Sequence, residues 1–178
     1  MKIKLIVFGL ILIVGVVGAV FGYLQYQRRV NISRVSSYDE CLSYSDSLNS
    51  YPPRCNTPDG RTFTENIGNE LEMIDEIMVT NPRPNQPIKN PTTIQGRARG
   101  SWFFEGRLSA ELADDNNKQL GSIVLVAEGE WMTDEFVQFK GDLTYIKPES
   151  GKGTLFIHKE NPSGQPENDK KLIIPVKF

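Results

Sequence analysis

The chain has 178 residues, enough for one ordinary domain with additional segments. Its 20 lysine and arginine residues nearly balance its 22 aspartate and glutamate residues. A nucleic-acid-binding domain usually carries a clustered basic face, so this balance argues against nucleic acid as a partner.

An apolar run near the N-terminus is typical of a membrane-spanning helix. After a tail at residues 1–4, Leu5 to Leu24 reads LIVFGLILIVGVVGAVFGYL without a charge. About twenty such residues cross a hydrocarbon core of about 30 Å as a helix. The run exceeds the apolar region of a cleavable signal peptide, although Gly18 and Ala19 leave cleavage open. We predict a single-pass transmembrane helix over residues 5–24 that contacts the lipid bilayer.

Flanking charge and cysteine content bear on the orientation of this helix. Lysines at positions 2 and 4 precede it and arginines at positions 28, 29 and 34 follow it, so charge gives no clear direction. Cys41 and Cys55 form an even pair at short spacing, and such pairs persist as disulfides in oxidising compartments. We therefore predict a plasma-membrane protein whose C-terminal domain is extracytoplasmic.

Two short segments follow the apolar run. Residues 25–37 are polar without a sustained period, which favours a juxtamembrane stalk. Residues 38–69 form a small segment in which a Cys41–Cys55 bridge would close a loop of about 15 residues and contribute roughly 3 kcal/mol. Pro58 to Gly60 predicts a turn into a short strand at Arg61 to Thr64.

The small segment also resembles the central part of Kazal-type protease inhibitors. Its residues 51–66 read YPPRCNTPDGRTFTEN, with a tyrosine, a proline and a cysteine before an Asp-Gly turn. Those inhibitors use three disulfides, and this chain has cysteines for one. A disulfide-clasped spacer is the favoured interpretation, with weak inhibition around Arg54 and Cys55 as an alternative.

The rest of the chain has short apolar runs separated by turn residues, a pattern typical of an all-β domain. Residues 70–76 favour about two turns of helix that merge into a first strand. Strands are expected at residues 77–80, 92–98, 107–112, 120–127, 136–145, 153–158 and 172–178. About seven short strands with regularly spaced turns predict an antiparallel β-sandwich. No long amphipathic helix interrupts them, which argues against an α/β enzyme fold.

Alternating apolar residues identify the expected core. They are Val137, Phe139, Leu143, Leu172, Ile174, Val176 and Phe178, with the aromatic residues Trp102, Phe103, Phe104 and Trp131.

Three motifs place bulky aromatics beside charges and glycines, as strand ends that feed specific loops do. They are RGSWFFEG at residues 99–106, GEWMTDEF at 129–136 and HKENPSGQPENDK at 158–170. They closely resemble the signature of the bacterial spore-germination-associated immunoglobulin-like domain, over residues 77–178. The resemblance implies an extracytoplasmic immunoglobulin-like β-sandwich of a surface protein. The antibody pattern of two cysteines and a tryptophan is absent from the sandwich, so packing must stabilise it.

Candidate reactive groups favour structural roles. His158 is the single histidine and lacks a cysteine partner, so no metal, cofactor or catalytic site is predicted. The run Asp114 to Asn117 favours a hairpin turn over a calcium loop. An acidic cluster at Glu128, Glu130, Asp134 and Glu135 favours a solvated strand end, with an envelope hydrolase as the alternative.

The most site-like element is the loop that follows His158. Its polar residues either hydrogen-bond within the loop or meet a partner. They are Asn161, Ser163, Glu167, Asn168 and Asp169, and Arg97, Arg99 and Glu105 are expected to pair with Glu167 or Asp169. The sequence thus predicts a non-enzymatic, membrane-anchored binding or structural protein whose immunoglobulin-like domain engages an envelope protein or polysaccharide.

Overall fold

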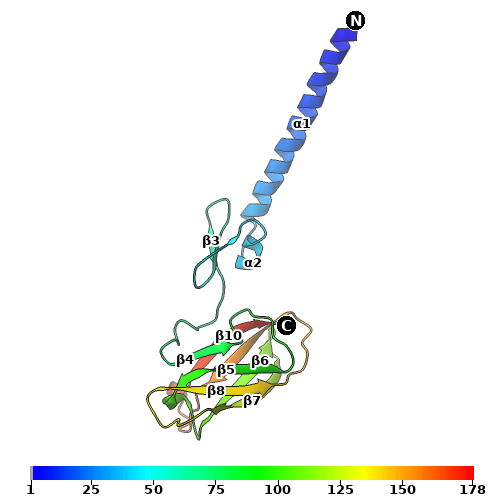
Figure 1. Cartoon of the computed structure of the whole chain (residues 1–178). Helices are drawn as coiled ribbons and strands as arrows, with labels where there is room; N and C mark the ends of the chain where they lie inside the picture. Colours follow the sequence, from blue (N-terminus) through cyan, green and yellow to red (C-terminus); the bar gives the residue numbers. More distant parts are fainter. Residues whose placement is uncertain (1) are drawn as a thin grey trace. The chain divides into compact units, whose positions relative to one another are not determined.

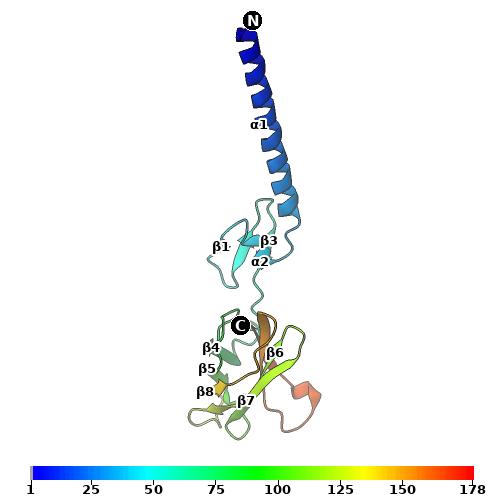
Figure 2. The same cartoon turned by 90° about the vertical axis from the view of Figure 1, so that its right-hand side faces the viewer.

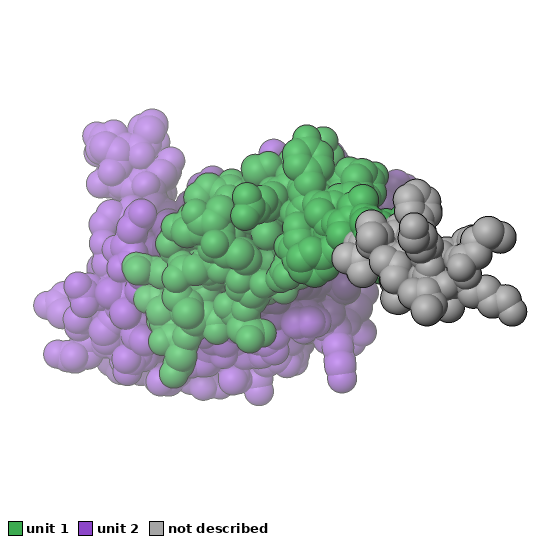
Figure 3. Space-filling view, turned by 90° about the horizontal axis from the view of Figure 1, so that it is seen from above, with its two compact units in different colours: residues 1–65 green, residues 66–178 purple. Residues whose placement is uncertain are grey.

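The structure is a computed structural model that describes residues 2–178, without the side chains of residues 2–12 and 14. It divides into two compact units, Met1–Glu65 and Asn66–Phe178, which Figure 3 colours separately. Each unit has its own cluster of buried apolar residues and is described by itself.

Unit 1 begins with the long helix α1 (Lys2–Ser33). The sequence contains no proline before Pro52, so nothing removes a backbone donor along this stretch. The helix therefore continues through residues 25–33 of the expected stalk. Part of the expected membrane span, residues 5–12 and 14, has side chains outside the described residues. Among the side chains that are described, no helix is both long and apolar enough to cross a membrane, and the span stays a prediction.

A small lobe completes unit 1 after α1. It contains α2 (Tyr38–Cys41) and an antiparallel sheet of β1 (Ser47–Leu48), β2 (Arg54–Asn56) and β3 (Thr62–Thr64). The predicted Cys41–Cys55 disulfide is confirmed, and both of its residues are fully buried. Val35 and the half-buried Tyr38, Tyr44 and Phe63 pack around it. The predicted turn is also present, because Gly60 has a φ of +89° and donates its N–H to the carbonyl oxygen of Thr57.

Unit 2 is an antiparallel β-domain whose seven predicted strands are confirmed (Figure 1). They are β4 (Ile77–Asn81), β5 (Thr92–Arg99), β6 (Arg107–Asp114), β7 (Gln119–Ala127), β8 (Phe136–Leu143), β9 (Lys152–His158) and β10 (Lys171–Lys177), with two short 3₁₀ turns, η1 (Gly100–Trp102) and η2 (Pro166–Asn168). The strand order is β10-β9-β6-β7-β8-β5-β4. The sheet folds over on itself, and in Figure 1 the strands β5 and β8 cross the line of β6 and β9.

The sheet bends between β7 and β8, where one layer of the sandwich passes into the other. These strands pair only at Val126 with Lys140 and Ala127 with Phe139, whereas β5 and β8 pair along their whole length. At the other end of the sheet, Pro87 forms a parallel bridge with Lys177. The chain that follows β4 therefore covers the edge of β10, which prevents that edge from pairing with other chains.

The two layers enclose one hydrophobic core. Every second residue of β6, β9 and β10 is buried, as the alternation predicts. Trp102, Phe103, Val137, Phe139 and Leu143 are buried, while Trp131 and Phe178 are half-buried. The expectation that Phe104 lies in the core is wrong, since its side chain is 45% exposed. It stands at the start of a tight turn in which Glu105 and Gly106 both have positive φ.

The two turns of helix expected at residues 70–76 are also absent. The segment instead makes separate turns, in which Met73 and Ile77 each donate to the carbonyl oxygen four residues back. Glu70 is buried and its carboxylate accepts hydrogen bonds from Arg83. Because Glu70 must reach Arg83 and Ile77 must enter the sheet, these contacts override local helix propensity.

Removing the disulfide should loosen the lobe of unit 1. The double variant Cys41→Ser, Cys55→Ser is expected to reduce the lobe's stability by roughly 3 kcal/mol, because the reduced loop gains freedom when it unfolds. Hydrogen exchange of the β2 and β3 amides should accelerate, while the amides of β5 and β6 serve as the control. Unchanged exchange in β2 and β3 would show that the lobe does not depend on the bridge.

Candidate functional site

The three sequence motifs meet at one end of the sandwich. Residues 99–106 connect β5 to β6, residues 129–136 lead into β8, and residues 158–170 connect β9 to β10. The antiparallel register places Arg99 opposite Phe136, and Ser109 near the start of β6 opposite His158. We call these three segments, together with Glu76, the motif cluster.

Trp102 lies at the centre of the motif cluster. Its side chain is fully buried, and its indole Nε1 donates to Oε2 of Glu76 at 3.1 Å. Its carbonyl oxygen accepts the N–H of Glu160 at 3.0 Å. One residue of the first motif thus fixes both the start of β4 and the start of the third motif.

Two glycines allow the second motif to pack against the first. The N–H of Gly100 donates to the carbonyl oxygen of Glu135 at 3.1 Å. A Cβ at Gly100 would lie 1.9 Å from the carbonyl oxygen of Thr133, so any side chain there clashes with backbone. A Cβ at Gly106 would lie 3.2 Å from the ring of Trp131, which covers this glycine. Glycine is therefore required at Gly100 for close backbone approach.

The arginines of the first motif do not pair with the third motif as expected. Arg99 donates from Nε to the carbonyl oxygen of Asp75 and from Nη1 to that of Asp134. The guanidinium groups of Arg97 and Arg99 lie 4.8 and 4.1 Å from the ring centroid of Phe136. The expected pairing with Glu167 or Asp169 is wrong, because the β5–β8 register brings Phe136 to the arginines instead.

The loop of the third motif is held by hydrogen bonds among its own side chains (Figure 2, salmon). Asn161 Nδ2 donates to Asp169 Oδ1 at 2.7 Å and to the carbonyl oxygen of Gln165 at 2.8 Å. Ser163 Oγ donates to Asn161 Oδ1 at 2.5 Å and accepts from Asn168 Nδ2 at 3.1 Å. The structure thus brings together four of the five predicted residues. The fifth, Glu167, is exposed in η2.

Glu76 closes the loop at its far end, a role that sequence reasoning missed. Its Oε1 accepts from Nζ of Lys170 at 2.6 Å, while Oε2 accepts from Trp102. The hydrogen bond from Lys170, aided by that from Trp102, lowers the pKa of Glu76 below its ordinary value of 4.5 against the opposing effect of burial. No local pattern marks this carboxylate, because Lys170 lies 94 residues away in sequence.

The other predicted residues lie in ordinary structural settings. His158 ends β9, and its ring centroid is 6.5 Å from that of Phe156. The residues Glu128, Glu130, Asp134 and Glu135 are exposed. Oε1 of Glu130 accepts the N–H of Met132 at 3.0 Å, within the same turn. Among the described residues, no three histidine, cysteine, aspartate or glutamate side chains are grouped to hold a metal ion.

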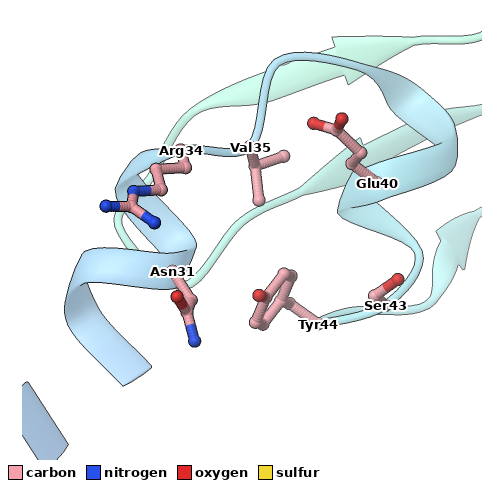
Figure 4. A pocket seen from close by; sticks show the side chains of 6 residues that line it. All are labelled: Asn31, Arg34, Val35, Glu40, Ser43 and Tyr44. Atoms are coloured by element: carbon pink, nitrogen blue, oxygen red, sulfur yellow. The ribbon is translucent and has the colours of Figure 1, made fainter. Parts of the chain in front are cut away.

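Unit 1 contains hollows of its own. One is lined by Asn31, Arg34, Val35, Glu40, Ser43 and Tyr44, and Figure 4 shows these side chains around it. The carboxylate of Glu40 is already engaged there, since its Oε2 accepts from the N–H and Oγ of Ser36 at 2.7 and 3.1 Å. These hydrogen bonds lower the pKa of Glu40. Arg34 and Glu40 carry opposite charges, so this hollow has no strong preference for an anion.

Comparison with known proteins identifies the domain type. The family model Gmad2, described as the immunoglobulin-like domain of bacterial spore germination, matches residues 76–165. The match includes Glu76, the first two motifs and the start of the third. No curated protein matches the chain, and no solved structure does so either.

Adding one methyl group at the centre of the motif cluster should destabilise unit 2. Gly100→Ala is expected to cost roughly 1–3 kcal/mol, because the new Cβ overlaps the carbonyl oxygens of Thr133 and Trp131. Chemical denaturation of the two proteins measures this difference. Gly151→Ala is the matched control, since no heavy atom lies within 4 Å of its Cβ. Equal stability of the two variants would contradict the close packing at Gly100.

The ion pair of Glu76 should make stability depend on pH. Because its folded-state pKa is lowered, Glu76 stabilises the fold above about pH 4.5, and this contribution is lost as pH falls through the folded pKa. Glu76→Gln should therefore lower the Tm at neutral pH, and its difference from wild type should shrink in acid. Glu72→Gln, an exposed residue of the same segment, is the control. A difference that is independent of pH would contradict the assignment.

Proposed function

The chain belongs to the family of immunoglobulin-like domains of bacterial spore germination, and from this we propose a membrane-anchored, extracytoplasmic binding or structural protein. Its immunoglobulin-like domain engages a protein or polysaccharide of the cell envelope. The family description names a type of domain and no reaction, so binding is the activity proposed.

The apolar character of α1 supports the anchor. The large apolar side chains described between Ile13 and Tyr26 are each between 53% and 64% exposed. A helix that is apolar on all sides is stable when protein or lipid surrounds it. The apolar run of residues 5–24 is also long enough for a bilayer core of about 30 Å. We assign lipid as the surrounding medium.

The disulfide supports an extracytoplasmic location for the rest of the chain. Cys41 and Cys55 are bridged and fully buried in the lobe next to α1. Structural disulfides persist in oxidising compartments and are rare where glutathione and thioredoxin keep thiols reduced. With a single membrane crossing, the domain that follows the lobe lies on the same side as the bridge.

The braced loop of residues 159–170 is the single observation that carries the binding proposal. Its residues from Pro162 to Lys170 are exposed, yet side-chain hydrogen bonds join Asn161, Ser163, Asn168 and Asp169 to one another. An exposed loop that is already ordered loses little conformational entropy when a partner binds. Glu167 stands on this ordered loop as an exposed charge, available to a partner.

Binding should depend on Glu167 without a change in folding. In a pull-down from cell envelope with full-length protein, Glu167→Ala should reduce partner recovery at unchanged Tm, because it removes an exposed side chain. Glu149→Ala is the matched control, since Glu149 is an exposed glutamate on the loop between β8 and β9. Equal recovery with both variants would mean that the loop is structural only.

A further inference from the structure

A second hollow in unit 1 lies where α1 meets the turn of the lobe. It is lined by Gln25, Arg28, Arg29, Ile32, Ser33, Pro58 and Asp59. All of these residues belong to unit 1, so the hollow lies within a single compact unit. Its lining combines two apolar residues, the buried Ile32 and the exposed Pro58, with the exposed Arg28 and Arg29.

Arg61 holds the two sides of this hollow together. Its Nη1 and Nη2 donate to the carbonyl oxygens of Val35 and Ile32, at 2.7 and 2.6 Å. The Ile32 carbonyl belongs to the last turn of α1 and the Val35 carbonyl lies just beyond the end of the helix, where the helix dipole is negative. Nε of Arg61 donates to Oδ2 of Asp59 at 3.0 Å, which fixes the turn against the helix. Arg61 is thus a structural residue that builds the hollow.

The negative charge of Asp59, the acidic residue of the hollow, is already paired with a positive charge. Asp59 pairs with Arg61 at 2.9 Å and accepts from Oγ1 of Thr57 at 2.5 Å. The hydrogen bond from Thr57, supported by Arg61, lowers the pKa of Asp59, so this carboxylate is ionised and committed. Among the described residues, no ion pair with an acidic side chain is made by Arg28 or Arg29. The hollow therefore has excess positive charge from these two arginines.

The position of the two arginines along α1 matches a lipid headgroup. Gln25 directly follows the apolar run, and Arg28 and Arg29 lie about 6 and 7.5 Å farther along the axis than Leu24. The polar layer on each side of a bilayer core is roughly 5–8 Å thick. A helix that crosses the membrane as proposed above would hold both guanidinium groups at the level of lipid phosphates.

We propose that this hollow binds the phosphate headgroup of an anionic phospholipid through Arg28 and Arg29. The inference rests on the proposed membrane anchor and adds a lipid preference to it. Two guanidinium groups present several N–H donors in a geometry that suits phosphate oxygens.

Native mass spectrometry of the detergent-solubilised full chain tests the proposal. Phosphatidylglycerol and phosphatidylcholine with the same acyl chains are added in equal amounts, and wild type should retain phosphatidylglycerol preferentially. The double variant Arg28→Gln, Arg29→Gln should bind both lipids equally. Arg28→Lys, Arg29→Lys should keep most of the preference, which separates loss of charge from misfolding. Arg54→Gln is the matched control, because it removes an exposed arginine of β2.

Each outcome decides the question. No preference in wild type, or the same loss in Arg54→Gln as in the double glutamine variant, overturns the proposal. Displacement of phosphatidylglycerol by inorganic phosphate at equal concentration also overturns it, since the site would then serve free phosphate. Recovery of the protein in the cell membrane fraction is measured in parallel. A protein absent from that fraction refutes the anchor, whereas an anchored protein without lipid preference refutes the headgroup site alone.

Discussion

The hydrogen bonds of Trp102 connect parts of unit 2 that are far apart in sequence. The indole reaches Glu76 before β4, and the Trp102 carbonyl oxygen reaches Glu160 after β9. Because the side chain is fully buried, an indole donor without a partner would carry a desolvation cost of about 1–3 kcal/mol. The ionised carboxylate of Glu76 supplies that partner and binds Lys170 with its second oxygen. The position of the braced loop therefore depends on the contacts of Glu76 with Trp102 and Lys170 and on the hydrogen bond from Glu160 to Trp102.

In unit 1, too, a few specific links connect segments that are far apart in sequence. There the disulfide joins α2 to β2, and Arg61 joins the turn before β3 to the end of α1. A segment this small has little apolar surface to bury, so covalent and charge-assisted links provide much of its order. These links also leave Arg28 and Arg29 with their charge uncommitted, which is the basis for the proposed headgroup site.

The strands were predictable from sequence because their patterns are local. Apolar residues alternate along Leu172 to Val176, and glycine or asparagine marks the turns, so neither strand nor turn requires knowledge of the partner. The disulfide followed from the presence of two cysteines. The segment from Glu70 to Glu76 was not predictable from local pattern, because its conformation is set by the hydrogen bond of Glu70 to Arg83 and by the entry of Ile77 into the sheet. The exposure of Phe104 was not predictable from its apolar character either, because the turn at Glu105 and Gly106 keeps its side chain at the surface.

The candidate site was predictable in composition but not in its contacts. The five polar residues of the loop could be named from sequence, whereas their mutual hydrogen bonds depend on the turn at Gly164 and on η2. The partners of Arg99 depend on β5 pairing with β8, two strands that are not consecutive in the chain. Contacts of this kind need the sheet order, which the alternation of residues does not contain.

Glu76 couples Trp102 to the third motif, and a double-mutant cycle measures this coupling directly. Trp102→Phe removes the indole donor and Lys170→Met removes the ammonium, so each variant takes away one of the two groups that bind Glu76. This coupling predicts that the free energies of unfolding deviate from additivity by more than about 0.5 kcal/mol. Strict additivity would contradict it, because the tryptophan and the loop would then be held independently.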